Sequence, residues 1–224
     1  MKKKILIISP HADDEILGCG GLISRYSKEG HNIHVLILTN ASESVPELYS
    51  KKKIDLIREE SKKANNLIGT KSLNFEELPA LNLHNYPQYK ISNIITSHVN
   101  IIKPEIVLIP SQQDIHQDHK IIFNAAKVSL RHNKKSSVKK ILSYEVLSET
   151  EWNENEQSFN PNFFVKLKKK DVDKKIRAFM KYKSQVKKFP NPRSKEAIFY
   201  LSRLRGSQVF MDYAEAFKVE KILE

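Results

Sequence analysis

The sequence lacks the features that would indicate a secreted or membrane-spanning protein. It contains a single cysteine, Cys19, among 224 residues, which excludes a disulfide framework and a cysteine-based zinc knuckle. The lysines near the N-terminus precede a short apolar stretch, ILIIS. That stretch is too short for a signal peptide, and no run approaches the length of a membrane span. We therefore expect a cytoplasmic protein with no membrane span.

Acidic residues are too few to balance the basic ones. Lys and Arg number 38 against 26 Asp and Glu, which leaves a formal net charge of +12. One alternative is therefore a basic protein that binds nucleic acid or an anionic surface without catalysis. However, the lysines are spread over most of the chain and form no single stripe with interleaved aromatics. We favour a lysine-rich, solvated surface and expect no nucleic-acid partner.

Long hydrophobic runs are absent, and short apolar runs alternate instead with amphipathic segments. Short apolar runs are typical of buried parallel strands, and apolar residues at helical spacing are typical of helices. The expected strands cover 3–9, 31–40, 72–80, 105–110 and 139–147, and the expected helices cover 14–29, 50–69, 88–104 and 117–133. This alternation predicts an α/β fold: a Rossmann-like doubly wound, mostly parallel sheet with helices on both faces. The length fits a single domain over 1–224, with a less regular C-terminal segment.

Two of the expected strands end in loops of unusual composition. Residues 9–21 read SPHADDEILGCGG, with three consecutive acids just after His11, and residues 114–119 read DIHQDH. In doubly wound sheets such strand-end loops can open onto one crevice. Clustered carboxylates repel one another unless a cation or hydrogen bonds compensate. Together the loops predict a bound divalent metal, whereas each alone would fit acids at a helix N-terminus or a surface histidine pair.

The two loops resemble the motifs of the PIG-L/LmbE-like family of zinc-dependent N-acetylglucosaminyl deacetylases. The marks of that family are P-H-P-D-D-E after the first strand and H-x-D-H further on. Weaker likenesses are REES (58–61), KYKSQ (181–185), RLRG (203–206) and YAEAF (213–217). The resemblance therefore covers nearly the whole chain. It implies a metal-dependent N-deacetylase, a hydrolase acting on linear amide C–N bonds.

The resemblance implies that His11, Asp14 and His119 hold Zn²⁺, with Fe²⁺ or another divalent metal as alternatives. Two histidines and one carboxylate leave coordination positions open, as catalytic zinc sites do. Zinc lowers the pKa of its bound water to near 7, which provides a nucleophile at neutral pH. Asp13 would then be the general base, because one of two adjacent carboxylates can ligate while the other accepts a proton.

The resemblance also implies roles for three residues that would not contact the metal. His116 would stabilise the tetrahedral intermediate or protonate the leaving amine. Asp118 would hold a histidine, taken to be His116, in the right tautomer. Arg58 would bind the substrate, although in sequence terms it could equally pair with Asp55 on a helix surface.

The sequence departs from the family pattern at two positions of the motifs. Ala12 stands where the family usually has Pro, which changes loop stiffness and leaves the ligand chemistry intact. Asp114 stands where some relatives carry a tyrosine electrophile, two residues before the first histidine of H-x-D-H. Any such electrophile must therefore come from elsewhere, for example from the C-terminal segment, or be absent.

The expected activity is removal of the N-acetyl group from an N-acetylglucosamine-like sugar or sugar conjugate. The expected partner is thus a small acetylated amino-sugar conjugate, and a homo-oligomer remains open. An iron(II) enzyme using the same two histidines and one carboxylate is a second alternative. A carboxylate next to the ligand set, on a βαβ crevice, favours hydrolysis over oxygen chemistry.

Overall fold

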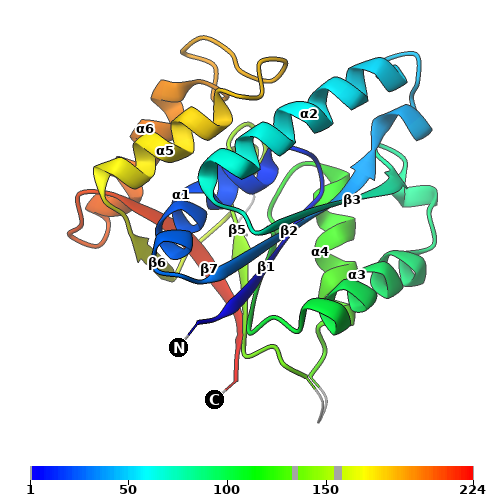
Figure 1. The fold of residues 1–224 in the computed structure, drawn as a ribbon, viewed down its shortest axis with the longest axis horizontal. Coiled ribbons are helices and arrows are strands. Elements are labelled where there is room, and N and C mark those ends of the chain that lie inside the picture. The colour runs from blue at the N-terminus through cyan, green and yellow to red at the C-terminus, as the bar shows by residue number, and fades with distance from the viewer. Residues whose placement is uncertain (1, 133–135, 154–157, 224) are drawn as a thin grey trace.

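In the computed structural model, which describes residues 2–132, 136–153 and 158–223, one seven-stranded sheet has the order β3-β2-β1-β4-β5-β7-β6 (Figure 1). The strands are β1 Lys4–Ser9, β2 Asn32–Asn40, β3 Ser72–Pro79, β4 Ile106–Pro110, β5 Lys140–Tyr144, β6 Phe163–Lys166 and β7 Ala214–Ile222. The first five strands pair in parallel, whereas β7 runs antiparallel to both β5 and β6. The chain order changes direction at β1, between β2 and β4, which is where doubly wound sheets bind ligands.

Helices cover both faces of this sheet (Figure 1). One core combines β-sheet residues with the apolar sides of α1, α2, α5 and α6, and a second combines them with α3 and α4. Successive side chains of β1 point to opposite faces of the sheet, so the strand contributes to both cores: Ile5 and Ile7 to the first, and Leu6 and Ile8 to the second. The helices are α1 Asp14–Lys28, α2 Lys51–Ile68, α3 Gln88–Ile102, α4 Gln117–Ser129, α5 Lys169–Phe179 and α6 Lys195–Ser207.

The predicted fold class is confirmed. All five expected strands and all four expected helices of the N-terminal two thirds form. The helices have apolar residues at helical spacing, and central strands such as β1 and β4 are continuous apolar runs buried on both faces. In the C-terminal segment, the sequence also indicates the helices α5 and α6 and the last strand, β7, which enters the same sheet between β5 and β6; β6 had no sequence signal of its own. Among the described residues, no helix has the length and apolarity needed to cross a bilayer.

Strand β7 also supports the helix that follows β1. The Glu215 carboxylate accepts hydrogen bonds from the backbone N–H groups of Gly21 and Leu22 in α1, both at 2.6 Å, and from Lys175 Nζ at 2.7 Å. Glycine is required for this approach, because a Cβ at position 21 would lie 2.4 Å from Leu167 Cδ1 and 2.9 Å from Glu215 Cδ. The segment YAEAF, which resembles the family and lies near the end of the sequence, thus holds α1 in place through hydrogen bonds to Glu215.

Candidate active site

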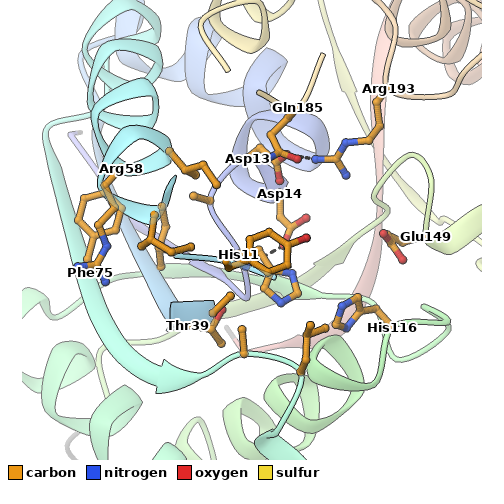
Figure 2. A pocket seen from close by; sticks show the side chains of 18 residues that line it. His11, Asp13, Asp14, Thr39, Arg58, Phe75, His116, Glu149, Gln185 and Arg193 are labelled. Carbon is orange, nitrogen blue, oxygen red and sulfur yellow. Dashed lines mark hydrogen bonds and ion pairs between the residues drawn. The ribbon is translucent and has the colours of Figure 1, made fainter. Parts of the chain in front are cut away.

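A cavity of about 200 Å³ opens at the carboxyl ends of β1, β2 and β3 (Figure 2). Helix α2 and segments that follow β5 and α5 complete its wall. One end is polar and the other is largely apolar. The polar and charged residues of the lining are His11, Asp13, Asp14, Thr39, Tyr49, Arg58, His116, Glu149, Gln185 and Arg193.

The three predicted metal ligands meet at the polar end. His11 Nδ1 lies 3.5 Å from Asp14 Oδ2, His119 Nε2 lies 3.2 Å from the same oxygen, and the two nitrogens are 3.3 Å apart. Ligand atoms at zinc bond lengths in a tetrahedral arrangement are separated by about 3.4 Å. The three residues therefore fit around one ion. His116 is close by: one ring nitrogen from each of His11, His116 and His119 lies within 4.8 Å of the other two.

Each proposed ligand histidine is oriented by a carboxylate on its other nitrogen. His11 Nε2 lies 3.1 Å from Asp118 Oδ2, and His119 Nδ1 lies 2.9 Å from Asp114 Oδ2. Carboxylates in this position fix the tautomer and orientation of metal-binding imidazoles. The carboxylate of Asp118 is itself fixed by the backbone N–H of Leu81, at 2.7 Å.

The expected partner of Asp118 is wrong in one respect: its carboxylate contacts His11 and not His116. Residues two apart at the start of a helix do not face each other, so the Asp118 side chain points away from the His116 ring. Instead, His116 is the N-cap of α4, and its Nδ1 accepts the backbone N–H of Asp118 at 3.1 Å. This leaves the proton of the neutral ring on Nε2. Burial and then the neighbouring His11 and His119 lower the pKa of His116 to about 4.

Asp13 occupies an unusual backbone conformation between the two ligands of its loop. Its φ of 114° lies in the left-handed region, which is costly for a non-glycine residue. Glu15 holds it there by accepting the Asp13 N–H at 2.9 Å. Glu15 is in turn held by the Tyr182 hydroxyl at 2.5 Å and Asn65 Nδ2 at 2.8 Å, and burial raises its pKa to about 7. The third acid of the motif is thus a support for the first.

Sequence reasoning missed two charged residues of the polar end. Arg193, from the segment between α5 and α6, forms an ion pair with the Asp13 carboxylate and donates from Nη1 to Ser148 Oγ at 3.2 Å (Figure 2). Glu149 lines the cavity beside His116, and burial followed by the charge of Asp114 raises its pKa to about 7. Neither residue stands in a periodic segment or a recognisable motif, so the sequence offered no signal for them.

Arg58 lies at the opposite end of the cavity, as Figure 2 shows. Its Nη1 pairs with Glu77 Oε1 at 2.8 Å, its Nη2 donates to the Glu76 carbonyl at 3.2 Å, and its guanidinium packs over the Phe75 ring. The apolar wall between the two ends includes Ile37 and Ile57. Arg58 thus lines the cavity with its guanidinium already paired, and its role in substrate binding stays a prediction.

Comparisons with known proteins agree with the fold and the motifs. Residues 6–130 match the family model described as PIG-L: GlcNAc-PI de-N-acetylase. The chain is 28% identical over 194 residues to YaiS of Escherichia coli K12, described as an uncharacterized deacetylase, covering 82% of this chain and 92% of that one.

Among solved structures, a conserved protein of Thermus thermophilus has a TM-score of 0.78 at 24% identity, covering 99% of this chain and 96% of its own. The N,N′-diacetylchitobiose deacetylase of Pyrococcus horikoshii has a TM-score of 0.78 at 20% identity, covering 98% of this chain and 84% of its own. These likenesses show the shared fold. Because the family model matches more than half of the residues, this chain belongs to the PIG-L family of deacetylases.

Proposed function

We propose that the protein is a zinc-dependent hydrolase that removes the N-acetyl group from an N-acetylglucosamine-like sugar or sugar conjugate. The observation that carries this proposal is the mutual spacing of His11 Nδ1, Asp14 Oδ2 and His119 Nε2, with the Asp13 carboxyl beside them. Family membership supports deacetylation over the alternative of a basic binding protein. The neighbour that acts on N,N′-diacetylchitobiose supports an acetylated amino sugar as substrate.

His11, Asp14 and His119 would hold the metal in this proposal. A zinc ion there supplies an activated water at neutral pH and polarises the acyl carbonyl. The same donor set serves iron(II) oxygenases elsewhere. Asp13 favours hydrolysis over oxygen chemistry, since a carboxylate that lies next to the ligands without binding the metal can accept a proton.

The remaining residues would transfer protons, donate hydrogen bonds, and position the other groups and the substrate. Asp13 accepts a proton from the attacking water, and its pair with Arg193 favours the ionised form that this requires. His116 is neutral with a proton on Nε2, so it can donate a hydrogen bond to the tetrahedral intermediate. Asp118 fixes the ring of His11, and Arg58 contacts the distal part of the substrate.

The test is metal content measured together with amine release from a panel of N-acetylglucosamine conjugates. We expect about one zinc per chain, as in mononuclear catalytic sites, and amine release that a chelator abolishes and zinc restores. The variant Asp13→Asn should keep the metal and lose about 10²–10⁴-fold in kcat, the usual contribution of a general base.

Three results would contradict parts of this proposal. A protein that takes up no zinc after reconstitution would refute the ligand set. Salt-sensitive binding to DNA or anionic vesicles without chelator-sensitive amine release would instead support the basic binding protein. Turnover by Asp13→Asn at the wild-type rate would remove Asp13 from the mechanism.

A further inference from the structure

Asp114 cannot supply the electrophile that a tyrosine supplies in some relatives. It is fully buried, and its carboxylate accepts from His119 Nδ1, from Thr150 Oγ1 at 3.1 Å and from the His116 N–H at 3.1 Å. All of these contacts orient other groups. A hydrogen-bond donor for the acyl oxygen, beyond His116, must come from another part of the cavity wall.

Two permanently cationic side chains are found in the described lining of the cavity, Arg58 and Arg193. Arg58 is at the apolar end, and Glu77 and the Glu76 carbonyl take up its donors. Arg193 is at the polar end, against the proposed base. Position and pairing therefore single out Arg193 as the cation nearest to where the chemistry would occur.

The contacts of Arg193 leave one of its three donor nitrogens without an acceptor among the described residues. Nη2 meets the Asp13 carboxylate and Nη1 reaches Ser148, but Nε is buried with no hydrogen-bond partner among the described residues. A buried unsatisfied donor is costly, so an oxygen that enters the cavity beside Asp13 would gain from meeting it. The guanidinium is in this sense a donor that a substrate oxygen can satisfy.

The backbone around Arg193 is fixed. Its N–H donates to Asn191 Oδ1 at 2.9 Å, and its carbonyl accepts the Lys187 N–H at 3.0 Å. The next residue, Ser194, caps α6 by accepting the Ala197 N–H. A donor anchored on both sides in this way needs little rearrangement during a reaction, which is what makes such groups effective in catalysis.

We propose that Arg193 is a further catalytic residue, whose guanidinium donates to the acyl oxygen of the substrate as that oxygen becomes an oxyanion. The proposal rests on the deacetylase function proposed above. As water attacks, an O–H bond breaks and its proton passes to Asp13, a C–O bond forms, and the carbonyl π pair moves onto the acyl oxygen. Asp13 thereby loses its negative charge as the acyl oxygen gains one.

A cation that contacts both groups retains an anionic partner throughout this transfer. When the oxyanion collapses, the C–N bond breaks and Asp13 gives the leaving nitrogen the proton that it took from the water, so the electrons and protons balance without another reactant. Arg193 then pairs again with the ionised Asp13, and the acetic acid loses its own proton to solvent. The ion pair seen in the structure is the state before and after the reaction.

The experiment compares Arg193→Ala and Arg193→Lys with wild type in amine release from methyl N-acetylglucosaminide. We expect Arg193→Ala to lower kcat on the pH plateau by about 10²–10³-fold, as loss of one oxyanion donor does elsewhere, with KM and zinc content little changed. Arg193→Lys, which keeps the charge, should recover part of the rate. Arg203→Ala is the matched control, because Arg203 is half exposed on α6 and contacts Asp212 away from the cavity.

Two readouts separate a substrate contact from a purely structural pairing with Asp13. If Arg193 only held Asp13, the acid limb of the pH profile would move to higher pH and the plateau kcat would remain, which would overturn the proposal. Binding of the methylphosphonamide of glucosamine, whose tetrahedral phosphorus imitates the intermediate, should weaken by a similar 10²–10³-fold, at about the level of one lost oxyanion donor. Binding of glucosamine should change little, and equal losses for both would also overturn it.

Failure of the proposed function has a different signature from failure of this inference. A wild-type protein that releases no amine from any conjugate refutes the deacetylase itself. A wild-type protein that is active, with an Arg193→Ala plateau within about threefold of it, refutes only the role of Arg193.

Discussion

Replacing Glu215 by alanine should destabilise the protein more than any change to a surface ion pair. The Glu215 carboxylate and the Lys175 ammonium are each only 6% exposed. The same carboxylate accepts the backbone N–H groups of Gly21 and Leu22. Alanine would leave a buried ammonium without a counter-charge and remove an acceptor from two helical N–H groups.

The magnitude follows from these contacts. Breaking a buried ion pair by removing one partner costs about 3–5 kcal/mol, and a hydrogen bond to a charged group contributes about 1.5–3 kcal/mol. Allowing for overlap between these contributions, we expect Glu215→Ala to lower the free energy of unfolding by about 5 kcal/mol. That is a large part of the free energy of unfolding of an ordinary domain, so the urea concentration at the midpoint of unfolding should fall sharply.

Two further variants test the reasoning. The double variant Glu215→Gln/Lys175→Met should be more stable than Glu215→Ala, because it replaces both buried charged groups by neutral ones and leaves no unpaired buried charge. Asp173→Ala, on the same helix α5, removes the exposed pair with Lys169 and should change stability little. A Glu215→Ala protein within about 1 kcal/mol of wild type would refute the reasoning, since one unsatisfied buried group alone costs that much.

Three further predictions follow from single contacts. Gly18→Ala would place a Cβ 2.3 Å from Tyr144 Cδ2 in the core and should cost about 1–3 kcal/mol in urea unfolding; unchanged stability would mean that the ring can move aside. Asp118→Asn should weaken zinc binding about 10–100-fold in a competition titration, and an unchanged Kd would refute its proposed supporting role. Although burial opposes it, Lys28 lowers the pKa of Asp171. The resulting stability is therefore present above about pH 4 and is lost as the pH falls further, so Asp171→Asn should flatten the acid limb of stability against pH.

The sequence was sufficient to predict the parallel part of the sheet and the edge at which the candidate site residues come together. Apolar runs such as 105–110 have one interpretation when helices alternate with them, and parallel strands bring their carboxyl ends to one edge. His11 and His119 are 108 positions apart, yet their ring nitrogens lie 3.3 Å from each other because both follow strands that flank the switch point.

The rest depended on tertiary contacts that local patterns do not contain. Arg193 reaches Asp13 because α5 docks against α1 and α6 docks against α5, and no periodic pattern in 186–194 predicts that docking. In the described part of the chain, the short strand β6 pairs with β7 alone, so its existence depends on where β7 inserts. The partner of Asp118 was predictable in principle, since residues two apart on a helix do not face each other.

A growing polypeptide acquires Glu215 late. Ribosomes add roughly 5–20 residues per second, so residues 11–119, with every proposed metal ligand, leave the exit tunnel several seconds before β7 does. During that interval α1 lacks the carboxylate that binds its Gly21 N–H, a contact spanning 194 positions. A chain truncated before residue 214 would thus carry both histidine motifs intact, but helix α1, which follows the first motif, would lack this support. Synthesis of β7 is the step at which the nascent protein gains a fixed site.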